Sequence, residues 1–313
     1  MTAVATLVIA FRRPEQTRLV LEQVRAAGVR RLFIALDAPR EGHAAEVQGA
    51  AAVRALAQGE AWAPQVEVNV ADRNLGAGQR PLSAISWFFD HVEEGVILED
   101  DCVPHPSLFP FCAEVLARYR NDERVMTVSG SNFAVAAGSR APDAPWHPYS
   151  YGFTQVQHTW GWATWRRAWR LHDPLMGTWP DARRLGVMRA LFREPDWREY
   201  WTRKMDGMHS GRPDAWDYAW YYTCMAQRGL CVMPAVNLVT NVGDDPAASH
   251  TGQHQRGRKA ANPFLRLPTA AMAMPLTHPP IVWADLEYER RLRRHLHPSW
   301  WRRRYEKLQR LLR

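Results

Sequence analysis

Short apolar runs alternate with amphipathic segments through the first 130 or so residues of the chain. Apolar stretches without polar alternation are typical of strands that are covered on both faces. They predict strands over 5–11, 31–36, 66–70, 96–98 and 125–129. Helical spacing of apolar residues predicts helices over 15–27, 44–58 and 81–92, and one within 104–120. This alternation favours an α/β, Rossmann-like fold with a mostly parallel central sheet and helices on both faces.

The pattern changes after about residue 135. Residues 136–150 are small, polar and proline-rich and predict a flexible loop. The region that follows is dense in tryptophan and tyrosine with little periodicity, except for a helical pattern over 218–226. Residues 237–254 predict another loop, and 286–313 a basic amphipathic helix.

These changes predict the domain organisation. We expect a catalytic domain over 1–255, with a nucleotide-binding half over 1–135 and an acceptor-binding half over 136–255. A C-terminal extension over 256–313 then carries the basic helix.

The strand over 96–98 ends in three consecutive acids, Glu99, Asp100 and Asp101. Neighbouring carboxylates repel one another unless they are paired. A divalent cation removes that repulsion, and oxygen ligands suit Mg²⁺ or Mn²⁺. Open α/β sheets also bind ligands at the carboxyl ends of their strands. The triplet therefore predicts a metal and phosphate site, the alternative being a solvated acidic turn.

Two other polar residues follow predicted strands. Arg13 follows the first strand and Asp37 the second. If these strands are parallel neighbours, both side chains converge with Asp101 on one sheet edge, where an arginine can bind phosphate and an acid can bind ribose or uracil. Taken alone, Asp37 is more typical of a turn or a cap.

Asp217 lies between Trp216 and Trp220, at the start of the predicted helix over 218–226. A carboxylate beside aromatic rings is a candidate general base for an attacking hydroxyl. The neighbouring indoles would then shape a sugar-binding wall. The alternative is an acid that caps the helix or interacts with its dipole.

His250 lies in the predicted loop, after Gly243-Asp244-Asp245. It could complete a metal shell or contact a diphosphate, and the alternative is an exposed loop histidine. The glycines at 76 and 78 match neither a Walker loop nor a dinucleotide fingerprint.

Composition narrows the partners. The net charge of +8 favours anionic partners, here nucleotide phosphates, acidic glycan or acidic lipid, and we expect no nucleic acid. The cysteines lack metal-ligand spacing and predict reduced, buried thiols in a cytoplasmic protein. We expect no signal peptide and no transmembrane segment. The basic C-terminal helix favours peripheral attachment to the inner face of a membrane, the alternative being a helix packed on the domain.

The chain resembles nucleotide-sugar glycosyltransferases of the GT-A fold, in particular the family of the Golgi N-acetylglucosaminyltransferase I and its bacterial relatives. The resemblance covers about residues 5–255 and rests on pieces in the same order. These are Val8-Ile9-Ala10 with Arg13, Asp37, residues 96–101 with Pro104 and Phe109, Gly161-Trp162, Trp216-Asp217 and the 241–250 loop. The middle of the chain diverges, so the donor and acceptor of the Golgi enzyme are not carried over.

The resemblance implies roles for single residues. On the donor side, Arg13 would touch the diphosphate, Asp37 the uracil end, Asp100 the ribose and Glu99 the donor sugar, with Arg80 near a donor contact. Asp101 would bind manganese, and His250 lies in the loop that closes over the donor. On the acceptor side, Asp217 would be the base of an inverting displacement, with Trp162 and Trp216 in the sugar-binding wall beside it.

The sequence therefore predicts an inverting, metal-dependent glycosyltransferase that uses a nucleotide-diphosphate sugar, with UDP as first choice. Its acceptor would be a glycan or lipid-linked hydroxyl in cell-envelope polysaccharide synthesis. One alternative is a nucleotide-sugar nucleotidyltransferase, which usually has a glycine-rich loop where this chain has Phe11-Arg12-Arg13-Pro14. The other is a non-catalytic protein that binds glycan or a membrane surface.

Overall fold

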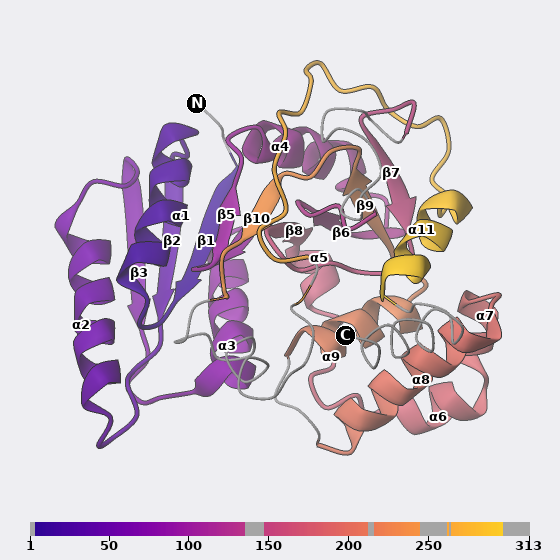
Figure 1. The fold of residues 1–313 in the computed structure, drawn as a ribbon, viewed down its shortest axis with the longest axis horizontal. Coiled ribbons are helices and arrows are strands. Elements are labelled where there is room, and N and C mark those ends of the chain that lie inside the picture. The colour runs from indigo at the N-terminus through magenta and orange to yellow at the C-terminus, as the bar shows by residue number, and fades with distance from the viewer. Residues whose placement is uncertain (1–3, 135–146, 212–215, 245–261, 263, 297–313) are drawn as a thin grey trace, which may run out of the picture.

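The computed structural model describes residues 4–134, 147–211, 216–244, 262 and 264–296. An eight-stranded sheet in the order β3-β2-β1-β4-β8-β6-β9-β7 forms the centre of the molecule, and β10 and β5 form a small second sheet (Figure 1). The strands are β1 (Ala5–Ala10), β2 (Arg31–Leu36), β3 (Gln65–Val70), β4 (Glu94–Glu99), β5 (Cys102–Pro104), β6 (Val125–Ser129), β7 (Tyr151–Thr154), β8 (Trp162–Trp165), β9 (Leu230–Pro234) and β10 (Val239–Asn241). The helices are α1 (Pro14–Ala26), α2 (Ala44–Gly59), α3 (Gly76–His91), α4 (Leu108–Tyr119), α5 (Arg166–Trp169), α6 (Trp179–Arg184), α7 (Val187–Leu191), α8 (Pro195–His209), α9 (Trp216–Ala226) and α11 (Leu286–Leu296).

The N-terminal half of the sheet is parallel, as the alternation of strand and helix predicts. Val8 of β1 lies opposite Ile34 of β2 and Leu98 of β4. Because side chains alternate along a strand, Val8 packs on the face that α1, α2 and α4 cover. Leu7 packs on the opposite face, with α3, α5 and α9. The predicted α/β fold with helices on both faces is confirmed.

The other half of the sheet is mixed. β8 lies between β4 and β6 and is antiparallel to both, and β7 is antiparallel to β9. The aromatic region thus supplies strands that its weak periodicity did not predict. The expected loop over 237–254 is also partly wrong, since Val239–Asn241 pairs with Cys102–Pro104. One sheet therefore crosses the expected boundary near residue 135, while the division at 255 stays a prediction.

The described part of the C-terminal segment packs on the sheet. Tyr288 and Leu292 of α11 are fully buried. Glu289 accepts a hydrogen bond of 2.6 Å from Thr154 Oγ1, and Arg293 pairs with Asp196 at 2.9 Å. The apolar face of α11 thus packs on the domain. This agrees with the alternative prediction for this helix, in which it packs on the domain rather than on a membrane. Residues 297–313, the rest of the expected basic helix, lie outside the described residues, and no helix in the described part is long and apolar enough to cross a bilayer.

Candidate active site

The carboxyl ends of β1 and β4 bring Arg13 next to the acidic triplet. Ile9 and Glu99 are register partners in these parallel strands, so the residues that follow them emerge at the same sheet edge. The guanidinium of Arg13 donates to both Asp100 and Asp101, and its Nη2 lies 2.9 Å from Asp101 Oδ2. The expected convergence of Arg13 with Asp101 is confirmed.

Burial and charge shift the titration of this cluster. Burial by itself would lower the pKa of Arg13, but the charges of Asp100 and Asp101 outweigh burial and raise it. Burial raises the pKa of Glu99 to about 8, with further contributions from the charges of Asp101, Asp217 and Asp100 and a smaller opposing one from Arg13. Beyond burial, the charges of the neighbouring carboxylates disfavour ionisation of Glu99 by more than Arg13 offsets, and a bound cation would relieve that repulsion.

The carboxylate of Asp37 does not face this cluster but the turn that leads into α3. Oδ1 accepts the N–H groups of Ala38 and Leu75, each at 2.9 Å. Oδ2 accepts the N–H of Gly76 at 2.9 Å and the amide of Asn74 at 3.3 Å. The structure therefore gives Asp37 the turn-anchoring role that the sequence left open, and its contact with uracil stays a prediction.

Arg80 lies buried beneath the same turn. Its Nη2 donates to the backbone oxygen of Asn69 at 2.8 Å and to the side-chain oxygen at 2.7 Å, and its Nη1 donates to Ser83 at 3.2 Å. Burial lowers the pKa of Arg80, and the charge of Asp37 partly opposes this. Arg80 thus ties α3 to β3, and a contact with the donor stays a prediction.

Asp217 is the second residue of α9 and is half-buried. One carboxylate oxygen accepts the N–H of Tyr218 at 3.0 Å. Trp216, which precedes it, stacks on Trp162, and Trp162 is the register partner of Ile97 near the end of β4. The start of α9 therefore lies near the carboxyl end of β4, and the charge of Asp217 contributes to the raised pKa of Glu99.

The tryptophans expected to form a sugar-binding wall lie mostly inside the protein. Trp162 stacks on Trp216 with ring centroids 5.9 Å apart. Only 1% of Trp162 and 8% of Trp216 are exposed, and Trp220 is fully buried. The expectation of an exposed wall is therefore wrong for Trp162, because β8 is an interior strand with both faces covered. Trp216 still lines a cavity, described below.

The segment after β10 supports Asp101 in a way that the sequence analysis missed. Asn241 Nδ2 lies 3.4 Å from Asp101 Oδ1, and Val242 donates its N–H to the backbone oxygen of Asp101 at 2.8 Å. A Cβ atom added to Gly243 would lie 2.3 Å from Asp101 Oδ2. The apolar pair Leu238-Val239, together with Gly243, is the signal that predicts a short strand and a close backbone approach here.

The described residues fit a metal ion whose coordination sphere is filled partly by a protein carboxylate and partly by substrate phosphates. In the described part of the chain, no three His, Cys, Asp or Glu side chains are placed to hold a metal ion. Mg²⁺ is commonly held through one or two carboxylates and substrate phosphates. Asp101, with 15% of its side chain exposed, offers one such carboxylate beside Arg13. His250, the second expected ligand, lies outside the described residues.

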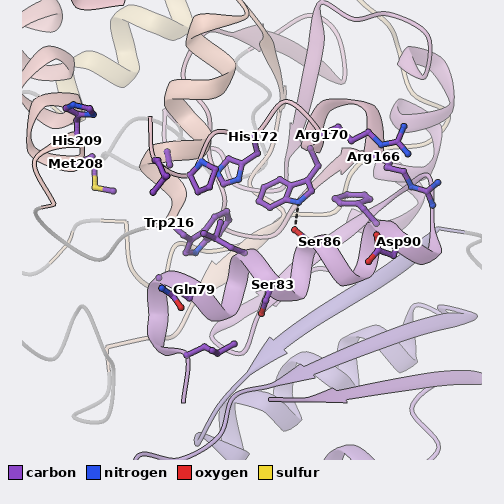
Figure 2. A pocket seen from close by; sticks show the side chains of 18 of the residues that line it. Gln79, Ser83, Ser86, Asp90, Arg166, Arg170, His172, Met208, His209 and Trp216 are labelled. Atoms are coloured by element: carbon purple, nitrogen blue, oxygen red, sulfur yellow. Dashed lines mark hydrogen bonds between the residues drawn. The ribbon is translucent and has the colours of Figure 1, made fainter. Parts of the chain in front are cut away.

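A cavity of about 1160 Å³ lies along α3, between this helix and the segments that contain α5, α8 and α9 (Figure 2). Its walls come from α3, from α5 and the turn after it, from the end of α8 and from the start of α9. The acidic triplet does not line it, but Leu75 and Trp216 do. The cavity therefore ends beside the turn held by Asp37 and beside the residue that precedes Asp217.

No protein-family model and no curated protein matches this sequence. Among solved structures, the chain is similar to the mannosyltransferase PcManGT from Pyrobaculum calidifontis in complex with GDP-Man and Mn²⁺. The two are 14% identical with a TM-score of 0.34, over 59% of this chain and 47% of that one. This chain thus spans about half the length of the mannosyltransferase.

Two further solved structures have lower identity. The inositol-1-phosphate CTP transferase from T. maritima is 11% identical with a TM-score of 0.31, over 55% of this chain and 75% of that one. The apo-form glycosyltransferase GlyE of Streptococcus pneumoniae is 10% identical with a TM-score of 0.31, over 73% and 45%. These neighbours include sugar transferases and a nucleotidyltransferase, and overlaps of this extent do not fix an activity for this chain. The more specific resemblance to N-acetylglucosaminyltransferase I stays a prediction.

Proposed function

We propose that this protein is an inverting, metal-dependent glycosyltransferase that moves a sugar from a nucleotide-diphosphate donor, with UDP-sugars as first candidates, to a hydroxyl of a glycan or lipid-linked acceptor. One observation carries the proposal. Trp216, the residue before Asp217, stacks on Trp162 of β8 next to the end of β4, while Arg13 and Asp101 lie 2.9 Å apart at that end of the sheet. An anion-binding group, a candidate metal ligand and a candidate base thus share one centre.

The chemistry assigns a role to each group. Arg13 would hold the diphosphate by charge-assisted hydrogen bonds once its carboxylate partners turn to the cation. Asp101, with His250, would hold the metal, which supplies charge neutralisation to the leaving diphosphate when bound. Asp217 would accept the proton of the acceptor hydroxyl as that oxygen attacks the sugar carbon. Asp100 and Asp37 would orient the nucleoside.

The alternative nucleotidyltransferase is less well supported. β1 ends at Ala10 and α1 begins at Pro14. This connection is too short to wrap a triphosphate, and it contains no glycine. A Gly-rich loop at that place is what such enzymes usually have, so we favour sugar transfer.

The proposed setting is cytoplasmic, with attachment to the inner face of a membrane through the basic C-terminus. Tyr288 and Leu292 pack on the domain. Contact with anionic lipid would therefore fall to the residues after Leu296, which include Trp300 and Trp301.

The test is nucleotide release. The full-length protein is incubated with a panel of nucleotide sugars and Mn²⁺, and the products are separated by ion-exchange chromatography. We expect nucleoside diphosphate, and Asp101→Asn should lower its release by about a hundredfold or more. Asp181→Asn is the matched control, because 72% of that side chain is exposed on α6, away from the sheet edge. Pyrophosphate instead would indicate the nucleotidyltransferase, and no product would indicate a binding protein.

A further inference from the structure

The cavity along α3 is an elongated groove. Its lining residues on this side run from Leu75, directly before α3, to Asp90, which at a helical rise of 1.5 Å per residue is about 22 Å. Figure 2 shows Gln79, Ser83 and Ser86 along the helix, with His172 and Trp216 above them. The groove is therefore longer than a single sugar ring and has room for several.

Its walls combine hydroxyl and amide groups with aromatic rings. Gln79 and Ser83 are exposed on α3. On the opposite wall, Trp169 donates its indole N–H to Ser86 Oγ at 3.1 Å and stacks on His172, with ring centroids 4.4 Å apart. Burial lowers the pKa of His172 to about 4, so the ring is neutral near pH 7. Its buried Nε2 has no hydrogen-bond partner among the described residues. Neutral polar groups interspersed with ring faces suit a polyhydroxylated ligand.

The charged far end of the groove is unfavourable for an acyl chain. Asp90, Arg166 and Arg170 line it there. Arg166 is engaged with Glu93, whereas Asp90 and Arg170 are exposed. Placing a lipid tail among these charges would require their desolvation, which is costly. Sugar hydroxyl groups can instead hydrogen-bond to them.

The near end of the groove adjoins two residues of the proposed site. Leu75 lines the groove and donates its N–H to Asp37, the residue proposed to orient the nucleoside. Trp216 lines it from the other side and directly precedes Asp217 on α9. A chain lying along α3 would therefore present its terminal unit beside Asp217, the proposed base.

We propose that this groove binds the acceptor, and that the acceptor is an oligosaccharide of three or more sugar units, recognised through its sugars. The inference rests on the proposed function and narrows its acceptor from a glycan or lipid-linked hydroxyl to an extended glycan. The lipid part of any lipid-linked acceptor lies outside the groove.

The experiment measures binding directly, without donor. The full-length protein is applied to an array of immobilised oligosaccharides of one to six sugar units. We expect binding to members of three or more units, and binding to single sugars at least about tenfold weaker, a difference of about 1.4 kcal/mol. Ser83→Trp, in the middle of the groove, and Asp90→Trp, at its far end, should each weaken binding about tenfold or more. Two variants are needed because Ser83 also contacts Arg80.

Ala51→Trp is the matched control, because it adds the same side chain to an exposed position on α2 that does not line the groove. Near-ultraviolet circular dichroism verifies that all the variants fold. Binding to no array member, equal binding of one and of several units, or unchanged binding by both groove variants would overturn the inference. The proposed function can fail separately from this inference. If the protein binds glycans but releases nucleotide from no donor, the result contradicts the transferase. If nucleotide release depends on Asp101 but glycan binding does not depend on the groove, the result contradicts only the acceptor site.

Discussion

Arg13 Nη2 and Asp101 Oδ2 lie 2.9 Å apart although 88 residues separate them in the sequence. Parallel pairing of β1 with β4 creates this contact, because it brings the ends of both strands to one edge. A cation and two carboxylates in a partly buried setting hold one another in place. In the proposed reaction, the same groups exchange these contacts for those to a diphosphate and a metal.

Asp217→Asn removes the proposed base while keeping the size of the side chain. We expect the rate of sugar transfer to fall by about a hundredfold to ten-thousandfold, the usual contribution of general base catalysis. The KM for the donor should stay within a few-fold of wild type, because the base acts on the acceptor. Steady-state kinetics with an acceptor that supports turnover measure both. Asp181→Asn serves as control, and a transfer rate equal to wild type would exclude Asp217 as the base.

Gly243→Ala tests the close approach of the β10 segment to Asp101. The added Cβ would lie 2.3 Å from Asp101 Oδ2, so the carboxylate or the backbone has to move. We expect the Mn²⁺ concentration for half-maximal activity to rise about tenfold or more, as loss of support around a metal ligand usually causes. Gly207→Ala in α8 is the control, since its Cβ meets nothing within 4 Å. Equal Mn²⁺ dependence in both variants would show that Asp101 is not a metal ligand.

Asp37→Ala separates the anchoring role from nucleotide binding. The change leaves the N–H groups of Ala38, Leu75 and Gly76 without their acceptor. Unsatisfied buried donors cost about 1–3 kcal/mol each, and water entering the turn offsets part of this. We expect a loss of about 2–4 kcal/mol in the free energy of unfolding, measured with urea. Wild-type stability combined with weakened nucleotide binding would instead identify Asp37 as a nucleotide ligand.

Glu289 makes the packing of α11 depend on pH. Burial raises its pKa from 4.5 to about 7, against the hydrogen bonds from Thr154 and Gln155. A carboxyl group whose pKa is raised in the folded state stabilises the fold fully below pH 4.5 and loses that contribution as pH rises through about 7. Between pH 5 and pH 8, the free energy of unfolding of the wild type should fall relative to Glu289→Gln by about 1–3 kcal/mol.

Thermal or urea unfolding of both proteins at several pH values measures this difference. Glu287→Gln on the same helix is the control, because the hydrogen bond from Arg291 lowers the pKa of Glu287 and its titration falls below this window. A wild-type and Glu289→Gln pair whose stabilities run parallel from pH 5 to pH 8 would contradict the prediction.

Truncation after Leu296 tests membrane attachment without disturbing the packed face of α11. We expect the full chain to sediment with vesicles that contain anionic lipid, and the truncated chain to stay in solution. A cut near Glu287 would be uninformative, because it removes the buried Tyr288 and Leu292. Equal partitioning of the full and truncated chains would exclude the tail as an anchor.

The sequence by itself determined the parallel half of the fold. Apolar runs such as Val96 to Leu98 are local patterns, and their alternation with helices leaves few possible topologies. The acids that follow this run, together with Arg13 after the first strand, predicted a polar cluster at one sheet edge because parallel strands end on the same side.

The tertiary structure alone decided the rest. The sequence did not predict β8, because this strand is defined by its pairing with β4 and β6, whose residues lie far away along the chain. For the same reason the burial of Trp162 and the four donors on the Asp37 carboxylate could not be predicted. The groove along α3 exists only because α5 and α9 pack opposite that helix. Local periodicity fixes which segments are strands or helices, whereas burial, pairing and cavities arise from contacts between distant segments, which no local pattern records.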